Sequence, residues 1–447
     1  MTEPLALHTA EETLEAVHTR RHDAYPEYRP YGIEWLGDVP EHWEVKRLKF
    51  LVRLVNAKVE ADEDTKRTYI GMENIESWTG KLRLPEDAFV PDGISNVFQS
   101  GDVLFGKLRP YLAKATTVDF GGLCSSELMV FRPARLYRRF LLYTLLADGF
   151  VKLVNSSTYG SKMPRANWEF IGGTRAPVPP LKEQQKIACF LDEQTGKIDG
   201  LIRARRDLLA LLREKRQAVI THAVTKGLDP AAKLQPSGIE WLGDVPEHWD
   251  VKRLKWDSAV LRGASPRPIE DPIYFDDNGE YAWVRISDVT AAGTYLHETK
   301  QRLSELGASL SVKLEPGDLF LSIAGSVGKP CITEIKCCIH DGFVYFPRLS
   351  CNRKFLYYIF ASGEPYKGLG KLGTQLNLNT DTVGSISMAF PPPEEQRAIV
   401  RFLDREMARM DDLESVVREA ISSLESLRTS IISAAVTGKI DVRGEGL

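Results

Sequence analysis

The sequence predicts an α+β protein in which two tandem mixed α/β domains alternate with two long helices that pair as a coiled coil. The first observation behind this prediction is a repeat: GIEWLGDVPEHWEVKRLKF, at residues 32–50, returns as GIEWLGDVPEHWDVKRLKW at residues 238–256. The copies differ only at Glu44/Asp250 and at the final aromatic residue. The second observation is a heptad pattern of apolar residues in two long segments that lack proline.

Further landmarks recur in the same order after each copy of the repeat. They are GDVLF at Gly101 and GDLFL at Gly317, PPLKEQQKIACFLDEQ at Pro179 and PPPEEQRAIVRFLDRE at Pro391, and AVTKG at Ala223 and AVTGK at Ala435. The chain is therefore an internal duplication. Its expected segments are an N-terminal helix and linker (1–31), a first domain (32–178), a first helical region (179–230), a second domain (231–390), and a second helical region with the C-terminal tail (391–447).

The N-terminal segment contains one helix candidate, with Thr9 as N-cap and Glu12 three positions later. Prolines between Tyr25 and Pro30 then indicate a linker. The repeat is expected to begin with turns and to end in a strand formed by VKRLKF. His42 and His248 could act as catalytic bases, but each lies in a Pro-Glu-His-Trp turn without a nearby titratable partner in the sequence. An architectural role beside a packed Trp is therefore favoured.

The bodies of both domains are expected to consist of short strands separated by Gly, Asn and Asp turns. Examples are TYIGMENI, DVLFGKL and LMVFRP in the first half, and YAWVRISDV, DLFLSIAG and GFVYFP in the second. Residues 138–154 and 352–362 carry apolar residues with a helical period at matching places. Outside the landmarks the two domains diverge strongly, which suggests one scaffold that recognises two different targets.

Each half then becomes helical, from Glu183 to about Thr225 and from Glu394 to about Val436. Apolar residues recur every seventh position, with a second stripe three or four residues away and Arg205 as an interruption. At about 1.5 Å per residue, each helix would be about 60 Å long. The expected helix–helix seam consists of Leu191, Ile198, Ile202, Leu209, Leu212, Val219, Leu403, Met407, Met410, Val417, Ile421, Leu424 and Ile431.

Composition is that of an ordinary soluble globular protein, with 43% hydrophobic and 27% charged residues. No apolar run approaches the roughly 20 residues of a membrane span, and MTEPLALHTAEETLE lacks the pattern of a secretion signal, so the cytoplasm is the expected location. The formal net charge of −3 gives no global attraction to nucleic acid, although phosphate binding depends on where basic residues lie.

No catalytic, metal or cofactor site is expected in this chain. GSVGK, at residues 325–329, lacks the GxxxxGK[ST] spacing, and Pro330 follows where a hydroxyl residue should stand. GxSxG, HExxH and an Asn-Pro-Pro-aromatic tetrad are missing. Six cysteines form no CxxC pair, and we expect them to be reduced. Cys331, Cys337, Cys338 and His340 lie in an alternating pattern typical of strands, which favours buried thiols over a metal site.

Polar side chains suited to reading DNA gather on glycine turns of both halves. Arg suits guanine edges, Asn and Gln suit adenine edges, and Lys and Ser commonly bind phosphate. The candidates of the first half are Lys107, Arg109, Tyr111, Lys114, Tyr159, Ser161, Lys162, Arg165 and Asn167. Those of the second half are Arg262, Arg267, Arg285, Ser326, Lys329, Lys371, Thr374, Gln375, Asn377 and Asn379. Their clustering is a stronger indication than any single member.

This arrangement resembles the specificity subunit of type I restriction-modification enzymes. The motifs that carry the resemblance are GIEWLGDVPEHW in both copies, PPLKEQQKIACFLD and PPPEEQRAIVRFLD at the helix starts, and AVTKG and AVTGK at the helix ends. The resemblance implies two target-recognition domains, each reading one half of a split, asymmetric DNA sequence, and two helices that pair antiparallel. Similar halves joined in this way would be related by an approximate two-fold axis.

The resemblance also implies partners for a chain without a catalytic site of its own. Two methyltransferase subunits are expected to dock on it, and restriction subunits with motor and nuclease activity to join the complex. S-adenosylmethionine, ATP and Mg²⁺ are then expected on the partner subunits, and no cofactor on this chain. The alternative is a coiled-coil interaction or scaffold protein without sequence-specific DNA binding.

Overall fold

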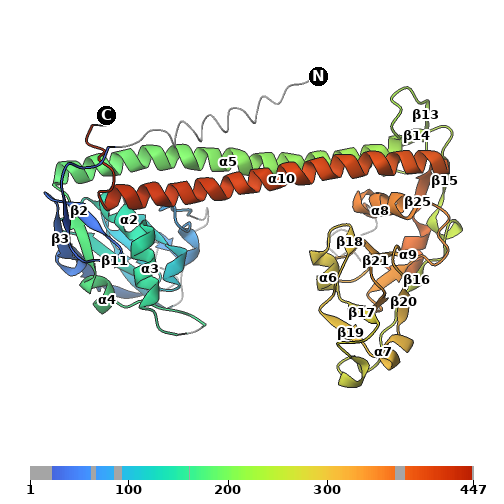
Figure 1. The fold of residues 1–447 in the computed structure, drawn as a ribbon, viewed down its shortest axis with the longest axis horizontal. Coiled ribbons are helices and arrows are strands. Elements are labelled where there is room, and N and C mark those ends of the chain that lie inside the picture. Colours follow the sequence, from blue (N-terminus) through green and yellow to red (C-terminus); the bar gives the residue numbers. More distant parts are fainter. Residues whose placement is uncertain (1–22, 62–66, 85–92, 161, 368–377, 445–447) are drawn as a thin grey trace. The chain divides into compact units, whose positions relative to one another are not determined.

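The structure, a computed structural model, describes residues 23–61, 67–84, 93–160, 162–367 and 378–444. The chain forms two compact units, of which unit 1 covers residues 1–206 and 418–447 and unit 2 covers residues 207–417. Each unit contains one mixed α/β domain and one end of each long helix (Figure 1). The predicted fold class is thereby confirmed. The helix expected after Thr9 lies outside the described residues.

Two four-stranded sheets form the body of the first domain. In the order β4-β11-β8-β9, the first sheet consists of β4 (Val52–Val55), β11 (Leu128–Pro133), β8 (Val103–Gly106) and β9 (Ala115–Thr117), all with antiparallel neighbours. The second has the order β5-β7-β10-β6, with β5 (Lys58–Ala61), β7 (Gly93–Phe98), β10 (Gly122–Cys124) and β6 (Tyr69–Ile70), which is parallel to β10.

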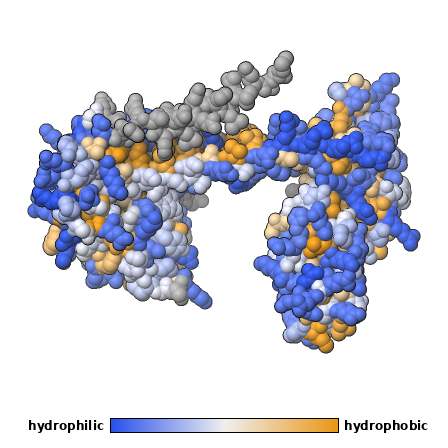
Figure 2. All heavy atoms as spheres, in the orientation of Figure 1, coloured by the Kyte–Doolittle hydropathy of each residue, from blue (hydrophilic) through white to orange (hydrophobic). Residues whose placement is uncertain are grey.

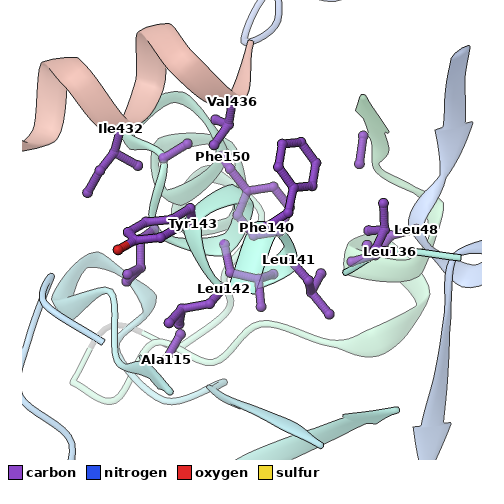
Figure 3. Close-up of a cluster of buried hydrophobic side chains, with 14 of the residues drawn as sticks. Leu48, Ala115, Leu136, Phe140, Leu141, Leu142, Tyr143, Phe150, Ile432 and Val436 are labelled. Atoms are coloured by element: carbon purple, nitrogen blue, oxygen red, sulfur yellow. The ribbon is translucent and has the colours of Figure 1, made fainter. Parts of the chain in front are cut away.

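Strand β8 is buried on both faces, because its successive side chains pack into two different cores. Val103 and Phe105 join the core formed with helices α2 (Arg138–Leu146) and α3 (Asp148–Ser156), whereas Leu104 joins the core shared with the second sheet. Successive strand residues point to opposite faces, so a strand covered on both sides is apolar throughout. Figure 3 shows part of the helical core, in which Phe150 and Tyr143 lie next to Ile432 and Val436 near the end of the second long helix.

The second domain also contains two sheets, although its sequence differs from that of the first domain. Its larger sheet has the order β16-β24-β21-β22-β18, with β16 (Leu261–Arg262), β24 (Phe343–Tyr345), β21 (Leu319–Ser322), β22 (Pro330–Thr333) and β18 (Tyr295–Leu296). The other has the order β19-β17-β23-β20, with β19 (Gln301–Leu303), β17 (Tyr281–Val284), β23 (Cys337–Ile339) and β20 (Val312–Leu314). Leu321 packs with the core around helix α8 (Arg353–Ala361), and Phe320 packs on the opposite face.

Small strand pairs connect each domain to its helix. β3 (Glu44–Arg47) pairs with β12 (Arg175–Val178), and β15 (Asp250–Arg253) pairs with β25 (Ser387–Phe390). β1 (Tyr28–Pro30) pairs with β2 (Asp38–Pro40), and β13 (Leu234–Pro236) with β14 (Asp244–Pro246). Residues 28–30 are therefore a strand where a linker was predicted, because their backbone finds a partner in the first copy of the repeat.

Three other elements differ from the sequence prediction. The strand expected for VKRLKF ends at Arg47 and continues as the 3-10 helices η1 (Leu48–Phe50) and, in the second copy, η4 (Leu254–Trp256). YAWVRISDV divides into β17 and helix α6 (Ile286–Ala291). The helical patch at residues 138–154 breaks at Ala147, where the backbone is extended and the amide of Asp148 donates to Ser433 Oγ over 3.1 Å. Tertiary contacts override the local pattern at this break.

The two long helices are α5 (Leu181–Lys226) and α10 (Pro393–Val436). In unit 1, Leu191 shares a core with Ile432, while Ile202, further along α5, packs with Leu424, earlier on α10. In unit 2, Arg216 of α5 forms an ion pair with Asp411 of α10, while Ile220, further along α5, shares a core with Leu403, earlier on α10. The helices therefore run antiparallel in each unit (Figure 1).

The seam residues differ in how deeply they are buried. Half-buried are Leu212, Val219, Ile421 and Ile431, and buried are Leu191, Ile198, Ile202, Leu209, Leu403, Met407, Met410, Val417 and Leu424. The apolar pattern did not reveal Arg428, which is buried in unit 1 and pairs with Asp199 over 2.9 Å. Asp199 also pairs with Lys81 over 2.6 Å, and Arg428 Nη2 donates to the carbonyl of Thr79 over 3.1 Å. This charged cluster attaches a loop of the first domain to the helix pair.

Candidate nucleic-acid interface

Two segments that are distant in the sequence of the first domain meet at one end of its central sheet. The loop between β8 and β9 is joined to the loop that precedes helix α4 (Trp168–Gly173) by two backbone hydrogen bonds. The amide of Arg109 donates to the carbonyl of Pro164 over 2.7 Å, and the amide of Ala166 donates to the carbonyl of Lys107 over 2.9 Å. Both groups of DNA-binding candidates of this domain therefore lie on one surface.

Three of these candidates have side chains that hold the loops in place. Arg165 forms a forked ion pair with Glu127, with Nε 3.1 Å from Oε2. Lys114 Nζ donates to the carbonyl of Met72 over 2.6 Å. Asn167 caps α4, because its Oδ1 accepts from the amide of Phe170 over 2.8 Å. Their geometry supports a positioning role for these groups.

Other candidates present their side chains to solvent. Tyr111 is 45% exposed and Tyr159 is 61% exposed, Arg109 and Lys162 are also exposed, and Lys107 is half-buried. Ser161 lies outside the described residues.

The backbone of the first loop is held in an uncommon conformation. Arg109 and Ala113, at φ 50° and 46°, flank the 3-10 helix η3 (Pro110–Leu112) in the left-handed region. Such backbone strain persists where surrounding contacts determine the conformation, and it is frequent in ligand-binding loops. Here the hydrogen bond to Pro164 and the burial of Pro110 hold the loop in place. The backbone that carries the Arg109 side chain is therefore fixed.

In the second domain, the three predicted arginines lie on β16, in the loop after β16 and at the N-cap of α6. Arg267 Nη2 lies 3.1 Å from Asp341 Oδ2, and Arg262 Nε donates to the carbonyl of the same aspartate. Arg285 is exposed and hydrogen-bonded to Gln301. These contacts place the three predicted arginines on the surface of one domain.

Ser326 and Lys329 lie on the loop after β21, beside α6. Lys329 Nζ donates to the carbonyls of Thr290 and Ala292 over 2.8 and 2.9 Å, and Ser326 Oγ lies 2.8 Å from Thr290 Oγ1. Partial burial lowers the pKa of Lys329. Lys329 therefore supports the loop with its side chain.

Asn379 is the structural counterpart of Asn167. Its Oδ1 accepts from the amide of Thr382 over 2.8 Å and caps helix α9 (Thr380–Ser385). The remaining candidates of this domain lie outside the described residues; they are Lys371, Thr374, Gln375 and Asn377. Ser326, Lys329 and Asn379 therefore lie on loops that correspond to those of the first domain, after β21 and before α9. The three arginines, in contrast, lie on or after β16 and at the start of α6.

Sequence reasoning missed the acidic members of both surfaces. Glu127 precedes β11 and Asp341 precedes β24, which are equivalent strands, and each carboxylate holds one or more arginines. A carboxylate can also accept a hydrogen bond from cytosine N4. The available signal was their position before the LMVF and FVYF runs, with Glu127 immediately before the first run and Asp341 separated from the second by Gly342.

The repeated motifs form a joint between each domain and its helix. Trp43 Nε1 donates to Glu183 Oε1 over 3.0 Å, and His42 Nε2 lies 2.9 Å from Glu183 Oε2. Tyr25 also donates to Glu183, over 2.7 Å; burial, and then this hydrogen bond, raise the pKa of Tyr25 well above its usual range. Glu183 lies in the first turn of α5, so the partner of His42 comes from a distant motif.

The same joint occurs in unit 2. Trp249 Nε1 donates to Glu395 Oε1 over 3.1 Å, and His248 Nε2 lies 2.7 Å from Glu395 Oε2. The histidines thus have the titratable partner that the local sequence did not reveal, and the geometry fits the architectural interpretation. Both glutamates stand at the same place in the PPLKEQQ and PPPEEQR motifs, which was the signal for this contact.

Among the described residues, no group of three or more His, Cys, Asp or Glu side chains is arranged to hold a metal ion. Burial raises the pKa of Cys331 and Cys337 to about 12, and that of Cys338 to about 11. These thiols are therefore protonated and unreactive at neutral pH. In the part of the chain that is described, no helix is long and apolar enough to cross a membrane.

Known proteins share this organisation. The family model of the type I restriction modification DNA specificity domain matches residues 40–207 and 246–422. The putative type I restriction enzyme MjaX specificity subunit of Methanocaldococcus jannaschii is 24% identical over 435 residues, covering 91% of this chain and 96% of the relative. The type I restriction enzyme EcoKI specificity subunit of Escherichia coli K12 is 23% identical over 444 residues, covering 90% of both chains.

Solved structures share the fold. A chain from work on complex assembly and conformational transition of the type I R-M system aligns with a TM-score of 0.71 at 23% identity, covering 91% of this chain and 99% of that chain. The crystal structure of the HsdS subunit from Thermoanaerobacter tengcongensis aligns with a TM-score of 0.50 at 23% identity, covering 90% of this chain and 98% of that chain.

Proposed function

The chain belongs to the type I restriction-modification DNA specificity family, and we propose that it reads a bipartite, asymmetric DNA sequence, one half-site per domain. The observation that carries this proposal is that each domain presents its own set of exposed polar side chains on surface loops of a shared scaffold. Arg109, Tyr159 and Lys162 face solvent on the first surface, and Arg267 and Arg285 on the second. Arginine side chains on preorganised loops suit guanine edges and phosphates.

We also propose that the chain acts as a non-catalytic scaffold in the cytoplasm. Two methyltransferase subunits, one for each half, would supply the S-adenosylmethionine site and the pocket for a flipped adenine. Restriction subunits would add ATP- and Mg²⁺-dependent motor and nuclease functions. The protonated buried thiols and the engaged histidines of the joints support a chain that does no chemistry itself.

The test is to sequence modified bases in cells that express the chain with its methyltransferase subunit, using cells with the methyltransferase alone as the control. We expect a single motif with two specific segments separated by a non-specific spacer. Unmodified DNA, or a motif with one continuous segment, would contradict the proposal.

A coiled-coil scaffold without DNA binding is the alternative, and a titration with salt separates the two functions. Contacts with phosphates release counterions, so the DNA affinity of a DNA reader falls steeply as the salt concentration rises. A filter-binding titration of the full chain, with and without the methyltransferase, should show this steep loss. Weak binding that does not respond to salt would favour the alternative.

A further inference from the structure

The last residues of each repeat form a surface that takes no part in the contacts with Glu183 or Glu395. In the first copy, Trp43 and Leu48 are buried, whereas the final residue, Phe50, is 62% exposed. In the second copy the final residue is Trp256, which is 69% exposed. Both copies thus end in a large aromatic side chain that faces solvent, and packing within the domain does not explain it. Figure 2 shows hydrophobic patches among hydrophilic side chains on the surfaces of both domains, and exposed apolar side chains also occur elsewhere in the chain, for example Ile94 and Leu211. The feature peculiar to these two residues is that they stand at the same place in both copies of the repeat.

Basic residues flank both aromatic side chains. In the first copy, Lys49 Nζ lies 5.3 Å from the centroid of the Phe50 ring. Aromatic residues, including Phe and Trp, and arginine are enriched in protein–protein interfaces. We define the first aromatic–basic patch as Arg47, Lys49 and Phe50, and the second as Arg253, Lys255 and Trp256, all of which are exposed.

Each patch lies beside a short helix that leads away from the candidate DNA-binding loops. α4 begins at its cap, Asn167, and ends next to η1, where the amide of Leu48 donates to the carbonyl of Thr174 over 2.8 Å. α9 begins at its cap, Asn379, and ends next to η4 through the equivalent hydrogen bond of 2.9 Å from the amide of Leu254. A protein bound to either patch is therefore close to the loops of the same domain.

We propose that each aromatic–basic patch docks one methyltransferase subunit, through a surface of that subunit that is both apolar and acidic. This inference rests on the proposed function. The two domains differ in their candidate DNA-binding side chains, whereas each patch keeps the same Arg and Lys and an aromatic residue, Phe50 or Trp256. A surface with the same chemical character in both copies contacts something that is the same in both halves. A subunit that flips a base must bind close to the loops that hold the DNA. The basic flanks complement an acidic partner surface.

The experiment measures binding of the purified methyltransferase subunit to the full chain by calorimetry and sedimentation. The variants are Phe50→Ser, Trp256→Ser and the double variant, and Ile273→Ser is the matched control, an apolar side chain that is 59% exposed in unit 2. We expect two sites in the unmodified chain and in the control. Each single variant should weaken one site by at least about 30-fold, as for a binding hot spot, and the double variant should weaken both.

A second pair of measurements separates docking from DNA contact and from misfolding. The DNA affinity of the chain without methyltransferase should be unchanged in the double variant. Lys49→Glu and Lys255→Glu, which change only exposed side chains, should weaken methyltransferase binding at the same sites. Wild-type methyltransferase affinity in the double variant would overturn the inference. Lost DNA affinity with normal methyltransferase binding would also overturn it and assign the patches to DNA phosphates.

The experiments distinguish failure of the proposed function from failure of the proposed docking site. An unmodified chain that binds no methyltransferase and directs no base modification would refute both the function and the docking site. If the unmodified chain directs modification of a bipartite sequence and the double variant binds methyltransferase as tightly, only the docking site is refuted.

Discussion

At the scale of single residues, the polar side chains of the candidate loops divide into those held by partners within the domain and those exposed to solvent. Arg165 and Lys114 are committed to Glu127 and to a backbone carbonyl, so their removal would disturb the loop before it disturbed any contact with DNA. Arg109 has the opposite character, because its backbone is fixed in the left-handed region while its side chain is exposed. It is therefore the best single position at which to test base contact in the first domain.

Replacing Arg109 with Ala should weaken binding to the specific DNA by about 5- to 150-fold, which corresponds to the loss of one bidentate base contact worth about 1–3 kcal/mol. The modified-base motif should relax at one position of the half-site read by the first domain. Affinity measurements and modified-base sequencing would check both effects. Arg213→Ala, at an exposed position of α5, is the control and should leave both unchanged. An unaltered motif and affinity in Arg109→Ala would remove this residue from the interface.

Residue roles were the least predictable part of the sequence. Composition and turn positions predicted basic and amide groups on surface loops, yet they could not show that Asn167 and Asn379 cap short helices. Nor could they show that Glu127 and Asp341 hold arginines, since these pairs form only when distant loops meet. Side-chain pairing of this kind depends on tertiary geometry.

At the scale of elements, the long helices were easier to predict from the sequence than the short strands and helices. The heptads predicted both long helices, because about five repeats of one pattern outweigh local noise. Short elements depended on partners elsewhere: β1 exists because β2 pairs with it, and the break at Ala147 is stabilised by Ser433. The sequence indicated the joints around Glu183 and Glu395 only through the motifs that occur in both halves.

Glu183→Ala tests the first joint. It removes the acceptor of Tyr25, Trp43 and His42, and each buried donor left unsatisfied costs about 1–3 kcal/mol. The free energy of unfolding, measured by urea denaturation, should fall by at least that amount. Its exposed neighbour, Lys182→Ala, should change stability little. Equal stability of the two variants would show that the joint does not hold the domain to its helix.

Leu424→Glu tests the helix pair. Leu424 is buried against Ile198 and Ile202, and truncation of a buried Leu costs about 2–5 kcal/mol, to which the burial of an unpaired charge adds. The same change at Leu211, which is 60% exposed on α5, is the control for helix propensity and charge. Thermal unfolding should occur at a much lower temperature for Leu424→Glu than for Leu211→Glu. Similar unfolding temperatures would contradict the assignment of Leu424 to the seam.

At the scale of the whole molecule, the duplication accounts for the organisation of the chain. Repeated motifs became the joints, helix starts and helix ends in both halves, and the diverged stretches became the loop surfaces. The sequence alone therefore predicted the order of domains and helices, because repetition is independent of any tertiary contact. It could not predict the DNA sequence that is read, since this depends on the positions of a few loop side chains.

The central claim is that the two domains read separate half-sites, and a domain exchange tests it most directly. Residues 51–178 are replaced with the corresponding domain of a relative with a known target, and modified bases are sequenced in cells that express the methyltransferase. The account predicts that one half-site becomes that of the relative, while the other half-site and the spacer length stay the same. A motif in which both half-sites change together would contradict it.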